Sequence, residues 1–156
     1  MSGVSRSLRL PAGALHGLRA AALAAPDGAR RLRDAGDVAG LALFDDFAAH
    51  VRETTGAEPE ALSIEAFTRE LAAHLAARGW GTVEIEPSDD ALRVTSADWV
   101  EGEPDAGASR PACHFSEGVL CGFFMRAAGE PIAVTQAACR SSGDAACVFV
   151  VGGRGA

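Results

Sequence analysis

The spacing of apolar residues along this chain changes close to Gly79. Before that point they recur every three or four residues, as in Ile64, Phe67 and Leu71, which is the spacing of an amphipathic helix. After it, apolar and polar residues alternate over residues 83–86, which is typical of a half-buried strand. The later segments read as a hairpin, a helix and a second hairpin. The pattern therefore predicts an α+β fold, with helices packed on a small antiparallel β-sheet.

Glycine, proline and polar clusters set the expected boundaries of these elements. Pro26-Asp27-Gly28 ends a first helix, residues 29–33 form a further turn or two, and Ser63 caps a later helix that stops at Gly79. Loops are expected at 53–59 and 101–110. The expected helices cover 15–22, 38–51, 64–78 and 115–127, and the expected strands cover 83–86, 92–99, 132–138 and 146–151.

The last expected helix carries two glycines, Gly118 and Gly122, four residues apart. A glycine inside a helix costs about 1 kcal/mol relative to alanine. Two at this spacing lie on one helix face, so they indicate a face packed closely against another backbone. Two tolerated glycines without such a contact are the alternative.

Length and composition are those of one globular domain. The chain has 156 residues with 14 basic and 21 acidic side chains, a net charge of −7 that argues against a nucleic-acid footprint. We expect a tail at 1–9, a single domain at 10–152 and a second tail at 153–156. No apolar run is long enough to span a membrane.

Two further features concern the origin and location of the chain. Lys, Asn and Tyr are absent, and since their codons are AT-rich, a GC-rich bacterial genome is indicated. The alanine-rich segment near the N-terminus contains His16 and Arg19, which fits an amphipathic helix better than a signal peptide. A cytoplasmic location is therefore expected.

Three of the four cysteines can meet. Cys139 and Cys147 are equally far from Gly143, so a hairpin centred there places them opposite each other. Cys113 precedes the glycine helix and can approach the same point, whereas Cys121 lies in the middle of that helix. In a reducing compartment clustered thiols bind metal or pack in the core. Spacing alone leaves both open.

The same segment resembles the 4-vinyl reductase domain family. The resemblance rests on the motif from Cys113 through Gly118 and Gly122, then on Gln136-Ala137-Ala138-Cys139 and Gly143-Asp144-Ala145-Ala146-Cys147. It implies a fold shared with TRAPP subunits and a structural zinc held by Cys113, Cys139 and Cys147. Gln136 occupies the position where the family has a fourth ligand, Glu. His114, Asp144 or water are the other candidates for that position.

The resemblance also implies a function, which is a small-ligand binding or sensing module without catalysis. Its partner is then a small hydrophobic or aromatic molecule, and the candidate lining residues are aromatic: Trp99, Phe115, Phe123 and Phe124. His50 and His74 are candidate hydrogen-bonding groups for a ligand. The alternatives are a homodimeric scaffold with a protein partner, and an accessory factor in tetrapyrrole reduction.

Catalysis and haem binding find little support in the residues. No glycine-rich dinucleotide fingerprint follows a strand, so hydride transfer is not expected. The haem-sensing relatives use tyrosine in their porphyrin contacts, and this chain has no Tyr.

Overall fold

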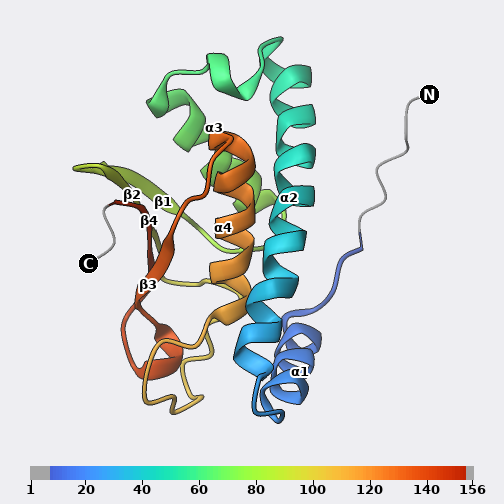
Figure 1. The fold of residues 1–156 in the computed structure, drawn as a ribbon, viewed down its shortest axis with the longest axis vertical. Coiled ribbons are helices and arrows are strands. Elements are labelled where there is room, and N and C mark those ends of the chain that lie inside the picture. The colour runs from blue at the N-terminus through green and yellow to red at the C-terminus, as the bar shows by residue number, and fades with distance from the viewer. Residues whose placement is uncertain (1–7, 154–156) are drawn as a thin grey trace.

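The computed structural model describes residues 8–153, in which four helices pack on a four-stranded antiparallel sheet. Residues 1–7 and 154–156, which fall in the two expected tails, lie outside the described residues. In Figure 1 the central helix α4 lies between the sheet and the long helix α2, and α1 lies against the lower end of α2. The helices are α1 (Ala12–Leu23), α2 (Gly28–Thr55), α3 (Ile64–Ala77) and α4 (His114–Ala128). The predicted α+β class is confirmed.

The sheet consists of two hairpins joined edge to edge. Its strands are β1 (Glu84–Ser88), β2 (Ala91–Ser96), β3 (Val134–Ala138) and β4 (Cys147–Gly152), in the spatial order β1-β2-β4-β3. Two short 3-10 turns, η1 (Pro59–Ala61) and η2 (Arg140–Ser142), complete the described elements. Strand β3 carries a bulge between Gln136 and Ala138, which shifts its register with β4 by one residue.

Several expected boundaries are wrong, and two of them change how the chain is organised. Residues 28–55 form one continuous helix instead of a short turn followed by a separate helix, and it ends at Gly56 with a φ of 71°. The second strand stops at Ser96 and does not reach Trp99, because Asp98 bonds back to the chain. The Asp98 carboxylate accepts from the Thr82 N–H at 2.7 Å and from Ser96 Oγ at 3.0 Å. Trp99 therefore lies outside the strand, directly after a turn at 97–98, with its ring buried.

Glycines bring α2 and α4 into direct backbone contact. A methyl group added to Gly118 would lie 2.0 Å from the Arg33 carbonyl oxygen, and one added to Gly122 would lie 2.1 Å from that of Asp37. The opposite helix contributes Gly36 and Gly40, where an added methyl group would meet α4 backbone at 2.1 and 2.2 Å. The close packing predicted from the glycine spacing is confirmed.

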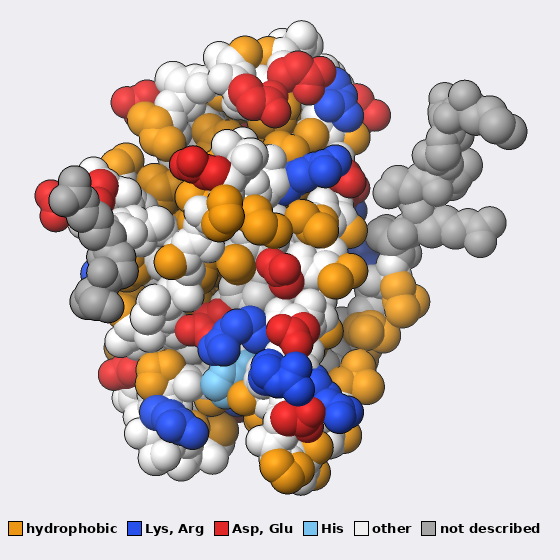
Figure 2. Space-filling model, in the orientation of Figure 1, with side chains coloured by type: hydrophobic (Ala, Val, Ile, Leu, Met, Phe, Trp, Pro, Cys, Tyr) orange, Lys and Arg blue, Asp and Glu red, His pale blue; other side chains and the backbone are white. Residues whose placement is uncertain are grey.

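Charged side chains of both signs share the surface. On the face drawn in Figure 2, acidic and basic groups lie beside one another with hydrophobic side chains between them. The ion pairs Arg33–Glu117 and Arg126–Asp45 each join α2 to α4. Within residues 8–153, no helix combines the length and apolar character needed to cross a membrane.

Candidate functional site

Three cysteines from separate segments form a buried cluster. Cys113 precedes the first residue of α4, Cys139 follows β3 and Cys147 begins β4. The Cys113 Sγ lies 3.6 Å from Cys139 Sγ and 3.9 Å from Cys147 Sγ, and all three residues are fully buried. Ala138 pairs with Val148 across β3 and β4, so the next residues along, Cys139 and Cys147, meet as expected.

The spacing of these sulfurs suits a zinc ion. Zinc–thiolate bonds are about 2.3 Å long, so two sulfurs on a tetrahedral zinc lie about 3.8 Å apart. The distances from Cys113 Sγ to its two neighbours fall on either side of that value. Three of the four corners of a tetrahedral site are thus in place without movement of the backbone.

Gln136, which stands where the family has its fourth zinc ligand, does not point an oxygen at the three sulfurs. Gln136 Oε1 accepts a hydrogen bond from the Cys113 backbone N–H at 3.0 Å, while its buried Nε2 has no partner. Asp144 is engaged too, since its Oδ2 accepts from the Cys139 N–H at 2.8 Å. Among the described residues no histidine or carboxylate joins the three sulfurs within 4.8 Å. His114 therefore does not complete the group in this conformation.

Hydrogen bonding within the cluster favours one thiolate. Hydrogen bonds from Cys113 and Cys147 lower the pKa of the Cys139 thiol far below its ordinary value. The same bond to Cys139 raises the pKa of Cys113, and burial adds to that rise. Of the three positions, Cys139 is therefore the one at which the neighbouring thiols favour the thiolate form. A cation bound here would replace the remaining thiol protons.

The buried carboxylate of Glu101, a residue expected only as part of a loop, caps α4 beside this cluster. Glu101 is fully buried, and its Oε2 accepts from the Ser116 N–H at 2.7 Å and from Ser116 Oγ at 2.5 Å. Its Oε1 accepts from the Phe115 N–H at 3.2 Å. Burial raises the pKa of Glu101, and these hydrogen bonds oppose that rise. Ser116 Oγ also accepts from Trp99 Nε1 at 2.7 Å, which fixes the Trp99 ring.

Helix α1 is attached to the same loop by two basic side chains. Arg19 is buried and donates to the Ala112 carbonyl oxygen at 3.0 and 3.3 Å. Its guanidinium lies 3.1 Å from the Glu103 carboxylate and 3.5 Å from that of Glu101. His16 Nε2 lies 2.8 Å from the Val100 carbonyl oxygen. The contacts of α1 thus reach the carboxylate that caps α4.

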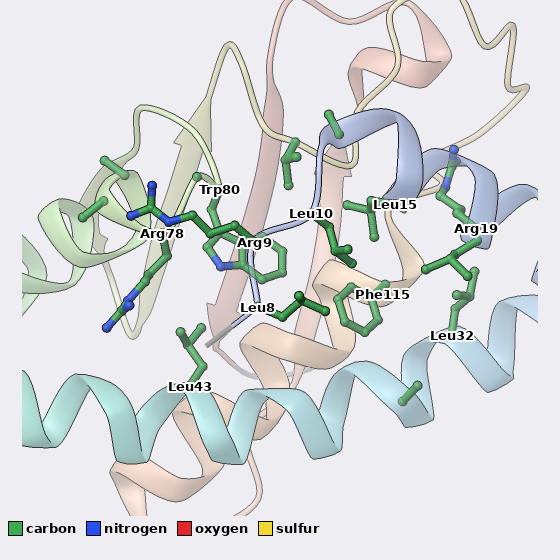
Figure 3. A pocket seen from close by; sticks show the side chains of 17 residues that line it. Leu8, Arg9, Leu10, Leu15, Arg19, Leu32, Leu43, Arg78, Trp80 and Phe115 are labelled. Atoms are coloured by element: carbon green, nitrogen blue, oxygen red, sulfur yellow. The ribbon is translucent and has the colours of Figure 1, made fainter. Parts of the chain in front are cut away.

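A large apolar pocket lies between α1, α2 and the end of α3. Its volume is about 740 Å³. In Figure 3 the Trp80 and Phe115 rings lie along the pocket, with Leu8, Leu10 and Leu15 from the N-terminal segment beside them. Trp80 stacks against Phe115 at 6.3 Å between ring centroids, and its other neighbour is the Trp99 ring at 5.4 Å. The volume and the aromatic lining are those of small-molecule sites in proteins.

The aromatic residues proposed from sequence are distributed over three environments. Phe115 lines this pocket, and Phe124 lines a second one of about 640 Å³ at the opposite end of α4. Trp99 and Phe123 are each 1% exposed and belong to the core. Trp80 was not among the residues predicted from the sequence. Its position depends on a contact between distant segments, since the Val100 N–H donates to the Trp80 carbonyl oxygen at 2.9 Å.

The two candidate ligand-bonding histidines lie together, away from this pocket. The His50 and His74 rings are 5.4 Å apart, and His74 is buried with its Nε2 3.1 Å from the Asp46 carboxylate. Burial lowers the pKa of His74; Asp46 opposes this, while Arg78 and His50 add to it. His74 is therefore a core histidine that favours its neutral form.

Comparison with known proteins bears on the segment that holds the cysteines. Residues 100–153 match the family model described as V4R domain. The predicted resemblance is confirmed. The V4R segment contains Glu101, the three clustered cysteines and all of α4. It excludes α1, α2 and Trp80, so most of the apolar pocket is built from residues before it.

Solved structures match over nearly the whole chain. The phenol-responsive sensory domain of the transcription activator PoxR, solved with phenol, has a TM-score of 0.73 at 16% identity and covers 96% of this chain and 77% of its own. A vinyl-4-reductase family protein from Methanocaldococcus jannaschii has a TM-score of 0.58 at 20% identity, covering 94% and 83%. A trafficking protein particle complex subunit 3 from Naegleria fowleri, covalently bound to palmitic acid, has a TM-score of 0.62 at 13% identity, covering 90% and 93%.

These likenesses establish the fold, including its TRAPP-like character. No curated protein matches the sequence.

Proposed function

We propose that this V4R-containing domain is a non-catalytic module that binds a small hydrophobic ligand in the pocket beneath α1. The pocket itself is the observation that carries the proposal. Its volume of about 740 Å³ falls in the range of small-molecule sites, and leucine side chains and two aromatic rings dominate its lining. That the same fold serves a phenol-responsive sensory domain supports the proposal.

A sensor must change its structure on ligand binding in a way that a partner protein can detect. Helix α1 is suited to that role. It forms one wall of the pocket through Leu15 and Leu18. Arg19 ties it to Glu101, which in turn caps α4 one turn from Cys113. A ligand that displaces α1 would therefore also disturb the start of α4.

Titration with N-phenyl-1-naphthylamine, an uncharged probe that fluoresces in apolar sites, tests the proposal. We expect saturable binding with one site per chain. Ala35→Phe places a ring in the pocket from an exposed position on α2 and should abolish that binding. Ala73→Phe makes the same change at an exposed position of α3 that does not line the pocket, so it should bind normally. Equal binding by both variants, or none by the unchanged protein, contradicts the proposal.

A structural metal ion is the second part of the proposed function. Cys113, Cys139 and Cys147 would hold it as thiolates, joining α4 to the β3–β4 hairpin. Zinc fits the sulfur spacing, and a water molecule would complete its shell because Gln136 is engaged elsewhere. Three thiolates bound to Zn²⁺ would carry a net charge of −1, instead of the −3 of three unbound thiolates, so the metal would make the buried thiolate form of the cluster less costly.

Native mass spectrometry of the purified protein measures this directly. We expect one zinc per chain, lost in Cys139→Ser together with thermal stability. Cys121→Ser is the matched control, since Cys121 lies outside the cluster and donates to the Ile132 carbonyl oxygen at 3.3 Å. Metal-free protein with three thiols that react under native conditions would contradict the metal site.

A homodimeric scaffold remains the alternative function. Exposed apolar side chains on the first two helices favour it, since Leu18 is 62% and Val38 is 69% exposed. Light scattering, combined with probe binding, distinguishes the ligand-binding module from the homodimeric scaffold. A concentration-independent monomer that still binds the probe supports the ligand-binding module, whereas a stable dimer without probe binding supports the scaffold.

A further inference from the structure

The charges around the pocket are one-sided. Seventeen residues line it, of which three are arginines (Arg9, Arg19 and Arg78) and none is acidic. The chain as a whole has 21 acidic and 14 basic side chains, so a lining with three cations and no anion runs against its composition. An uncharged ligand would form no ion pair with these arginines.

One of the three cations is already satisfied. Arg19 is buried and paired with Glu101, Glu103 and the Ala112 carbonyl oxygen, as described above. Its guanidinium therefore has little capacity left for a ligand, and it lies at the Leu32 end of the pocket in Figure 3.

The other two cations lie at the opposite end. In Figure 3 the Arg9 and Arg78 side chains are both drawn at the Trp80 end of the pocket. Arg78 contacts the Asp46 carboxylate through Nη2 at 2.6 Å, and its side chain is 39% exposed. Arg9 is exposed and forms no ion pair with any residue in the range 8–153. Asp46 thus compensates Arg78, whereas the Arg9 guanidinium has no acidic partner among residues 8–153, which leaves one positive charge uncompensated at this end.

From this arrangement, and building on the proposed function, we infer that the ligand is an amphipathic carboxylic acid. Its apolar chain would lie along Leu15, Leu43, Trp80 and Phe115, and its carboxylate would be held by Arg9 and Arg78. Guanidinium groups donate paired hydrogen bonds that match the two oxygens of a carboxylate. An apolar site without cations would instead reject such an acid in favour of the alcohol, because the carboxylate would lose its hydration.

Displacement of N-phenyl-1-naphthylamine by decanoate and by 1-decanol, at pH 7 and low salt, tests the inference. We expect decanoate to bind about tenfold more tightly than decanol, a difference of about 1.4 kcal/mol. Arg9→Gln should weaken decanoate binding several-fold and leave decanol binding unchanged. Arg9 lies outside the helices and makes no ion pair among the described residues, so this variant should fold normally.

Arg78→Gln should weaken decanoate further, and the double variant should lose the preference altogether. Arg93→Gln is the control: it removes an equal charge from an exposed position on β2, away from the pocket, and should keep the preference. Decanol binding as tightly as decanoate, or a preference that survives the double variant, overturns the inference while leaving the proposed pocket intact. Failure of the neutral probe itself would instead count against the proposed function.

Discussion

Replacing Gly118 by alanine should destabilise the protein, although alanine is the better helix former. The added methyl group would lie 2.0 Å from the Arg33 carbonyl oxygen and 2.8 Å from the Asp37 backbone nitrogen. Real contacts of this kind are longer than 3.0 Å. Both neighbours belong to the backbone of α2, so neither can rotate away, and α2 and α4 must separate by about 1 Å.

The expected loss can be worked from two opposing contributions. Forcing an extra methyl group into a packed interior costs typically about 1–3 kcal/mol, and a backbone neighbour places this site at the upper end. Alanine gains about 1 kcal/mol over glycine in helix propensity. The net loss of unfolding free energy is then about 2 kcal/mol. With a urea dependence of about 2 kcal/mol per molar, the unfolding midpoint should fall by about 1 M.

Urea unfolding followed by circular dichroism measures this, with Gly17→Ala as the matched control. Gly17 lies inside α1, and a methyl group there would meet no atom within 4 Å. This control should raise the unfolding free energy by about 0.5–1 kcal/mol, because only propensity and chain entropy change. If Gly118→Ala stabilises the protein as Gly17→Ala does, the close backbone contact of α2 and α4 is refuted.

Three further results are expected. Glu101→Gln removes the charge facing Arg19, so amide exchange in α1 should become faster and stability should fall by about 1–3 kcal/mol; unchanged exchange in α1 would disprove this attachment. Ser116→Ala should cost about 1–3 kcal/mol and shift tryptophan emission, because it leaves the buried Trp99 Nε1 without its acceptor. Burial lowers the pKa of His74 below 6.5, so the unfolded chain binds more protons and stability should fall as the pH drops below about 6.5; urea unfolding of His74→Gln should show a flatter pH dependence, and an equal slope would contradict it.

The features that the sequence predicted correctly depend on residues close together in the chain. The meeting of Cys139 and Cys147 follows from the symmetry of a short hairpin about Gly143. The close packing of α4 follows from two glycines one turn apart. Its partner could also have been identified, since Gly36 and Gly40 have the same spacing in α2.

The features that the sequence reading missed are assembled from distant segments. The pocket joins residues near Leu15, Leu43, Trp80 and Phe115, and no local pattern indicates that these side chains meet. Glu101 is one of 21 acidic residues, and only the folded chain places it at the start of α4. The continuous α2 was missed because its first turns carry few apolar side chains, and α2 exposes the charged side chains of that segment to solvent.

The ligand pocket is the central claim, and the two tryptophan indole N–H resonances test it most directly. The chain has only two tryptophans, of which Trp80 lines the pocket and Trp99 is buried with its N–H donating to Ser116. Titration of ¹⁵N-labelled protein with 1-naphthol should shift the Trp80 resonance in a saturable way and shift that of Trp99 less, with Trp80→Phe providing the assignment. Saturation without movement of the Trp80 resonance, or no saturable change at all, would contradict the account.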